Sequence, residues 1–158
     1  MDRVVAAVLF LALSSSLAWA QPEGTSGAQP EGPALSEQYF LDRASESAKT
    51  GDMDAAAQLF QSAIIYAPTD PIPYLRLGQL YAQSGRRELA QQYFGLALNV
   101  EPAYAPALEG LALLDLAAGN RAGAEAQRDM LLRACGATCP ETAQVERALN
   151  ADKGTPAN

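Results

Sequence analysis

The stretch PIPYLRLGQLYAQSGRRELAQQYFGLALNVEPAY, residues 71–104, decides the fold of this 158-residue chain. In its first half, Tyr74, Leu77 and Tyr81 recur at steps of three and four, the spacing of one helix face. Gly85 suits a left-handed helix end, where a Cβ would cost roughly 1–2 kcal/mol. A second apolar stripe follows this glycine. The stretch therefore predicts two helices joined by a tight turn.

The same pattern recurs along the chain with a period of 34 residues. Self-similarity at this period predicts stacked helical hairpins, because no single repeat can bury its apolar face alone. The recurring sets are Phe40 and Tyr74; Ala44, Gly78 and Ala112; Gly51, Gly85 and Gly119; Ala56, Ala90 and Ala124; Phe60 and Phe94; Ala63, Ala97 and Leu131; and Pro68 and Pro102.

These residues identify a family. The second repeat has the family pattern of aromatic, Leu, Gly, Tyr, Ala, Phe, Ala and Pro in Tyr74, Leu77, Gly78, Tyr81, Ala90, Phe94, Ala97 and Pro102. With them the chain resembles the tetratricopeptide repeat family, here a small exported bacterial member. The resemblance implies an all-α fold of three hairpins, residues 37–70, 71–104 and 105–138, stacked as a short right-handed superhelix. The third repeat departs from the pattern at Gln127 and Arg128, which stand where Tyr93 and Phe94 stood.

The ends of the chain lie outside these repeats. Residues 1–20 have one early cation, an apolar run and Ala-Trp-Ala at the end, which predicts a secretory signal peptide cleaved after Ala20. The apolar run is too short for the ~20 residues of a membrane span. Residues 21–35 are rich in Pro and Gly and predict a flexible linker. The repeat domain is expected over 36–150, with a capping helix at 140–150 and a disordered tail at 151–158.

Composition excludes some functions. The formal net charge is -7 and the pI about 4.5, so the chain should repel phosphate backbones, and we expect no nucleic-acid partner. The absence of histidine removes the commonest general base and metal ligand. We expect no cofactor, no metal and no catalytic residue. The expected location is the periplasm of a bacterium, or secretion, with no membrane span left after signal cleavage.

A partner is expected on the concave surface, which in this family the first helix of each repeat lines. Carrying the family's inward positions over predicts a mostly apolar groove without Lys, Arg or Asn, suited to an amphipathic helix or an extended apolar peptide. Two alternatives stay open: the leucines cover each other, or the protein's own N-terminal segment fills the groove. The positions are Gln38, Leu41, Ser45 and Ala48; Ile72, Leu75, Gln79 and Ala82; and Pro106, Glu109, Leu113 and Leu116.

The two cysteines, Cys135 and Cys139, lie four apart between the last repeat and the capping helix. In an exported chain this spacing predicts a disulfide that fastens the capping helix to the repeats. A redox-active pair is the weaker reading, since the spacing is not that of the CxxC motif. A zinc site would need two further ligands.

Three other groups of charged residues are candidate functional sites. The carboxylate pairs Asp42 with Glu46 and Glu125 with Asp129 share helix faces with Lys49 and Arg121 and predict solvated ion pairs rather than catalysis. Arg86 with Arg87 follows a turn, where an exposed helix start is favoured over a phosphate site.

The sequence therefore favours a non-enzymatic adaptor or scaffold that binds another envelope protein or peptide. The alternatives are a chaperone-like binder of unfolded exported chains and a hydrolase with an unrecognised carboxylate site.

Overall fold

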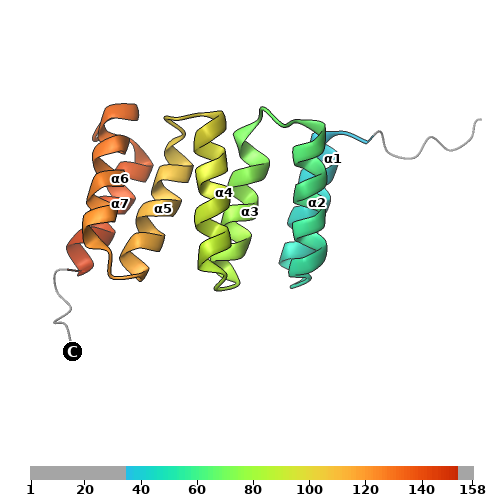
Figure 1. Ribbon diagram of the computed structural model, residues 1–158, viewed down its shortest axis with the longest axis horizontal. Helices are drawn as coiled ribbons and strands as arrows, with labels where there is room; N and C mark the ends of the chain where they lie inside the picture. The colour runs from blue at the N-terminus through green and yellow to red at the C-terminus, as the bar shows by residue number, and fades with distance from the viewer. Residues whose placement is uncertain (1–34, 153–158) are drawn as a thin grey trace, which may run out of the picture. The chain divides into compact units, whose positions relative to one another are not determined.

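The computed structural model describes residues 35–152. The predicted signal peptide, most of the linker and residues 153–158 lie outside this range. The described part of the chain contains seven helices and no strand, which confirms the predicted all-α fold of helical hairpins (Figure 1). The helices are α1 (Glu37–Lys49), α2 (Met53–Tyr66), α3 (Pro71–Gln83), α4 (Arg87–Val100), α5 (Ala105–Ala117), α6 (Arg121–Ala134) and α7 (Pro140–Asp152).

Local signals explain where the helices begin and end. Gly51, Gly85 and Gly119 follow the first helix of each hairpin with φ of +86°, +73° and +74°, a conformation in which a side chain would be strained. Asp52 caps α2, since its carboxylate accepts a hydrogen bond of 3.0 Å from the backbone N–H of Ala55. The chain therefore turns sharply at the same place in each hairpin.

Consecutive hairpins pack through large side chains of the second helices. Phe94, which is 2% exposed, places its ring against Gly78 of α3 and Gly110 of α5. A Cβ at Gly78 would lie 2.5 Å from the ring carbon Cδ1, and one at Gly110 would lie 2.6 Å from Cζ. Both glycines therefore leave room for this ring, which joins the second hairpin to the third.

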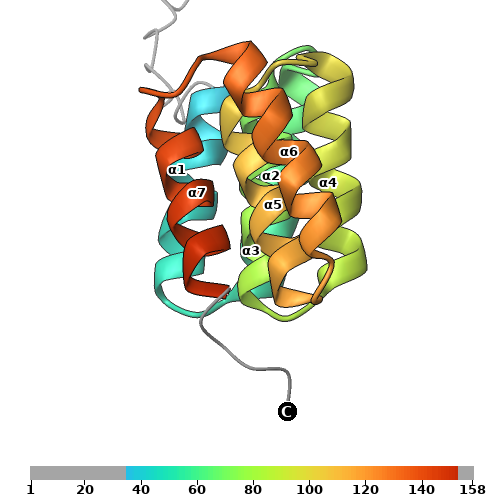
Figure 2. The same cartoon turned by 90° about the vertical axis from the view of Figure 1, so that its left-hand side faces the viewer.

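The helices form two layers in the described unit. Figure 2 shows α4 and α6 on one side and α1 and α7 on the other. The final helix, α7, packs against α5 and α6 and buries Thr142, Val145 and Leu149. It takes the place that the first helix of a fourth repeat would take, and it ends at Asp152, two residues beyond the expected end at 150.

Among the described residues, no helix has both the length and the apolar character needed to cross a membrane.

Candidate functional site

Two adjoining cavities lie along the first helices, and together they are called the groove. The larger, of about 440 Å³, lies between α3, α5 and α7. The smaller, of about 380 Å³, lies between α1 and α3. Gln79 and Gln83 of α3 line both cavities, which makes them one continuous feature. The lining residues are Ser45, Ala48, Lys49, Phe60, Arg76, Gln79, Leu80, Ala82, Gln83, Phe94, Pro106, Glu109, Gly110, Leu113, Leu114 and Gln144.

The groove carries opposite charges at its two ends. Lys49 and Arg76, both exposed, line the smaller cavity. Glu109 lines the larger one. The Arg76 guanidinium donates a hydrogen bond of 3.2 Å to the side-chain oxygen of Gln79, which stands between the two ends. A bound chain would therefore meet cations over α1 and α3, and an anion over α5.

The middle of the groove offers amides and an aromatic ring. Gln83 and Gln144 are exposed, and each side chain can both donate and accept hydrogen bonds. Phe94 reaches the larger cavity although it belongs to α4, because Gly110 has no side chain to cover the ring. The lining therefore combines an apolar floor with polar walls.

Glu109 is half-buried and has no hydrogen-bonding or ionic partner among the described residues. Burial raises the pKa of its carboxyl above the ordinary value of 4.5, and the negative charge of Glu141 raises this pKa further. An unpaired carboxylate in such surroundings favours an incoming cation or proton.

Seven of the twelve expected positions line the groove: Ser45, Ala48, Gln79, Ala82, Pro106, Glu109 and Leu113. The other five lie elsewhere. Gln38 donates a hydrogen bond of 2.7 Å to Asp42, and Ile72 is exposed beside a different cavity near the start of α3. Leu41 and Leu116 are half-buried and pack against the core.

Leu75 differs most from its expected position. We expected this residue at the centre of the groove, but it is 6% exposed and packs in the hydrophobic core. Its neighbour Arg76 lines the groove instead. The first helix of the second hairpin is therefore turned so that a basic side chain, rather than a leucine, faces the cavity. We expected a groove without basic side chains, and this expectation is wrong, because Arg76 and Lys49 line the smaller cavity.

Sequence reasoning missed other lining residues for a simple reason. Lys49, Arg76, Gln83 and Gly110 each follow an expected position by one residue, because the groove is wider than a single stripe of each helix. Gln144 was missed because α7 was expected only to cap the repeats. The available signal was the polar character of Lys49, Arg76 and Gln83, which are exposed on the first helices.

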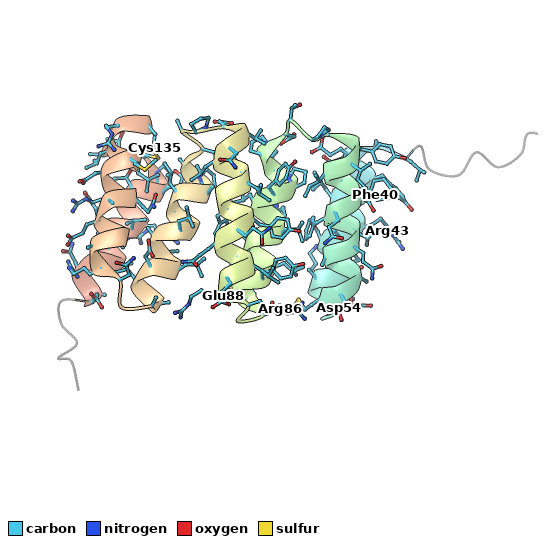
Figure 3. The ribbon with its side chains drawn as sticks, in the orientation of Figure 1. Phe40, Arg43, Asp54, Arg86, Glu88 and Cys135 are labelled. Carbon is cyan, nitrogen blue, oxygen red and sulfur yellow. A yellow bond between two sulfur atoms is a disulfide. The ribbon has the colours of Figure 1, made fainter. Side chains whose placement is uncertain are left out.

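The remaining charged candidates are engaged elsewhere. Arg86 lies 3.6 Å from the Asp54 carboxylate and over the ring of Tyr81. Arg86 and Asp54 are labelled in Figure 3. Arg87 donates a hydrogen bond of 3.2 Å to the carbonyl of Ala117. These contacts favour a structural role for both arginines.

Of the carboxylate pairs, Glu125 lies 3.0 Å from Arg121. Glu46 lies 3.9 Å from Lys49, and Asp129 lies 2.7 Å from Arg128. These three carboxylates thus belong to ion pairs of the helix surface.

Cys135 and Cys139 lie at disulfide-bonding distance, with a Cα–Cα separation of 5.6 Å (Figure 3). The potential ligand atoms of these cysteines and Glu141 lie within 4.8 Å of one another. While the sulfurs are bonded to each other, neither is a thiolate that could bind a metal. Thr142 donates a hydrogen bond of 3.0 Å to the carbonyl of Gly136 and so holds the intervening loop against α7.

Comparisons with known proteins agree with this architecture. NPGR2 of Arabidopsis thaliana is 36% identical over 81 residues, which make up 51% of this chain and only 11% of the plant protein. Among solved structures, the type III secretion chaperone SycD of Yersinia enterocolitica, in complex with a peptide of the translocator YopD, superposes with a TM-score of 0.65. It has 21% identity and covers 73% of this chain and 91% of SycD.

Two other solved structures have the same fold. The first tetratricopeptide domain of Spaghetti (RPAP3), bound to an HSP90 peptide, gives a TM-score of 0.64 at 14% identity and covers 75% of this chain and 94% of that one. The TPR2B domain of yeast Sti1, in a complex with pHsp70, gives a TM-score of 0.66 at 16% identity and covers 74% of this chain and 95% of that one. A sequence model described as tetratricopeptide repeat matches residues 48–100. Residues 48–100 therefore resemble the tetratricopeptide repeat, and residues 35–152 have the same helical-hairpin fold as these solved structures.

Proposed function

We propose that this protein is a non-enzymatic adaptor whose groove binds a peptide segment of another protein. The observation that carries the proposal is the continuity of the two cavities across α1, α3, α5 and α7 at Gln79 and Gln83. A groove that runs across several repeats suits an elongated ligand better than a small compact one.

The lining explains how such a segment is held. The amides of Gln79, Gln83 and Gln144 can pair with backbone N–H and C=O groups, which every peptide offers. Ala82 has a small side chain that leaves space for the chain to approach, and the half-buried Leu113 and Leu114 supply apolar surface for one side chain. The shallow groove implies modest affinity, since ordering a flexible peptide offsets much of the contact energy.

The solved neighbours support this proposal through the fold alone. SycD holds a YopD peptide, and the Spaghetti domain holds an HSP90 peptide. Their low sequence identity carries no information on the ligand of this chain.

We further propose that the protein is exported and works in a bacterial cell envelope, in the periplasm or after secretion. The support is the pattern of residues 1–20, a short n-region, an apolar run and a small-residue cleavage site. Its partner is then another envelope protein. Intact mass of the recovered protein tests this, since cleavage after Ala20 leaves Gln21 as the first residue.

The experiment that tests groove binding fills the groove and leaves the fold intact. Ala82 lines the larger cavity, and Ala82→Trp places an indole there. The matched control is Ala126→Trp on the exposed surface of α6. Wild type and both variants are applied to an immobilised array of short peptides of varied sequence, and circular dichroism checks their helicity.

We expect Ala82→Trp to lose peptide binding and Ala126→Trp to keep it. Equal binding by both variants, or no binding by the wild type, would refute the proposed groove. The same array separates the adaptor from the chaperone-like alternative. An adaptor selects a few related sequences, whereas a chaperone binds many that share only apolar character.

A further inference from the structure

We propose that Glu109 forms a subsite that selects a basic side chain, Arg or Lys, in the bound peptide. This inference rests on the proposed peptide-binding function and specifies the chemistry of its ligand. The subsite consists of the Glu109 carboxylate, the Leu113 side chain, Gly110 and the ring of Phe94, all of which line the larger cavity.

The Glu109 carboxylate has no basic side chain as a partner within residues 35–152. The half-buried arginines Arg121 and Arg128 do have carboxylate partners: Arg121 lies 3.0 Å from Glu125 and 2.9 Å from Asp152, and Arg128 lies 2.7 Å from Asp129. Within residues 35–152, no basic group lies within ion-pairing distance of Glu109. This carboxylate therefore loses hydration on folding without gaining an ionic partner.

The charge close to Glu109 is also negative. The electrostatic neighbour that influences Glu109 is Glu141, which is also negative. The cations of the groove, Lys49 and Arg76, belong to the other cavity, beyond Gln79. Negative potential is thus concentrated at the α5–α7 end. A basic residue of a ligand is attracted there and repelled from the α1–α3 end, which also sets the direction of binding.

The shape of the larger cavity suits a long basic side chain. A cavity of about 440 Å³ has space for a long side chain. The methylene stem of Arg or Lys can lie along Leu113 while its charged head reaches the carboxylate. Arginine has the further advantage that its planar guanidinium can make two parallel hydrogen bonds to a carboxylate. A helix with only a structural role gains nothing from a carboxylate that destabilises the fold. A binding site can keep such a carboxylate, because the ligand supplies its partner.

The test uses a peptide array whose flanking positions vary over Ala, Leu, Ser and Tyr and whose central residue is Arg, Lys, citrulline or Glu. Citrulline has the shape of arginine without its charge. With the full-length chain, we expect Arg and Lys peptides to bind about tenfold more tightly than citrulline peptides, or about 1.4 kcal/mol, and Glu peptides to bind most weakly. Glu109→Gln should bring Arg peptides to the citrulline level.

Two further variants make the test specific. Glu88→Gln removes an exposed carboxylate at the start of α4, labelled in Figure 3, and should leave the preference for Arg unchanged. Glu109→Lys should invert the order, so that Glu peptides bind best. This charge reversal tests the subsite independently of Glu109→Gln, and circular dichroism monitors the folding of each variant.

The outcomes separate the two proposals. Equal binding of Arg and citrulline peptides overturns the subsite and leaves the groove in place. A preference for Arg that survives in Glu109→Gln also overturns the subsite. Failure of the wild type to bind any peptide overturns the proposed function, and the subsite with it.

Discussion

Replacing Gly110 by alanine isolates the contact that joins the second and third hairpins. Gly110 lies inside α5, where helix propensity alone would make Gly→Ala stabilising by about 1 kcal/mol. The added Cβ would, however, lie 2.6–2.8 Å from three ring carbons of Phe94. The ring has little room to move away, because it also lies against Gly78, where an added Cβ would be 2.5 Å from Cδ1. Overpacking of this kind typically costs 1–3 kcal/mol.

The chain offers a matched control in Gly95. This glycine lies inside α4, and no described atom lies within 4 Å of a Cβ added there. Gly95→Ala should therefore stabilise the protein by up to about 1 kcal/mol. Gly110→Ala should lie about 1–3 kcal/mol below this control in the free energy of unfolding. Urea denaturation of both variants, with unchanged slopes, measures the difference.

A third variant tests the cause. In a Phe94→Leu background the aromatic ring is gone, so Gly110→Ala should approach the behaviour of Gly95→Ala. The reasoning is refuted if Gly110→Ala stabilises the wild type as much as Gly95→Ala does. It also fails if the penalty is unchanged in the Phe94→Leu background.

Phe94→Ala should cost ~3–5 kcal/mol, because it empties a site that is 2% exposed, whereas Arg128→Ala, its counterpart in the third hairpin, should cost much less; near-equal thermal melts would contradict this. Cys135 and Cys139 should resist thiol labelling until the disulfide is reduced. On a chain-entropy estimate the bond contributes about 2 kcal/mol to the free energy of unfolding. Hydrogen exchange should show that reduction loosens α7 before α1–α4. Glu109→Gln should raise the free energy of unfolding at neutral pH. Because the folded-state pKa of Glu109 is raised, this gain should appear as pH rises above 4.5 and vanish in more acidic solution, which denaturation at several pH values can follow.

The hairpins could be predicted because their signals are local. Each turn glycine has a positive φ in the structure, as Gly85 was expected to have. Phe60 and Phe94, which recur at the period of 34 residues, are both buried in the core. Such features depend on residues within one or two turns of each other, so the linear pattern contains them.

The groove could be predicted only in part. Glu109, Gln79 and Leu113 lie where the family pattern placed them, but Leu75 is buried and Arg76 takes the expected place beside the cavity. A rotation of a helix by one residue turns its face by about 100°, since a turn contains 3.6 residues. The helical periodicity of the sequence can be recognised whatever this rotation is. The rotation nevertheless decides which residue lines the cavity.

The sequence by itself determined the all-α class, the period and the hairpin turns, because these follow from backbone preferences and burial of nearby apolar side chains. Only the tertiary structure decided which side chains meet across hairpins. Phe94 reaches the groove through the gap at Gly110, and Gln144 joins the same cavity from α7. These contacts depend on how far each hairpin is rotated against the next, which is set by the simultaneous packing of several helices. The separation of the groove's charges, with Lys49 and Arg76 at one end and Glu109 at the other, follows from that rotation.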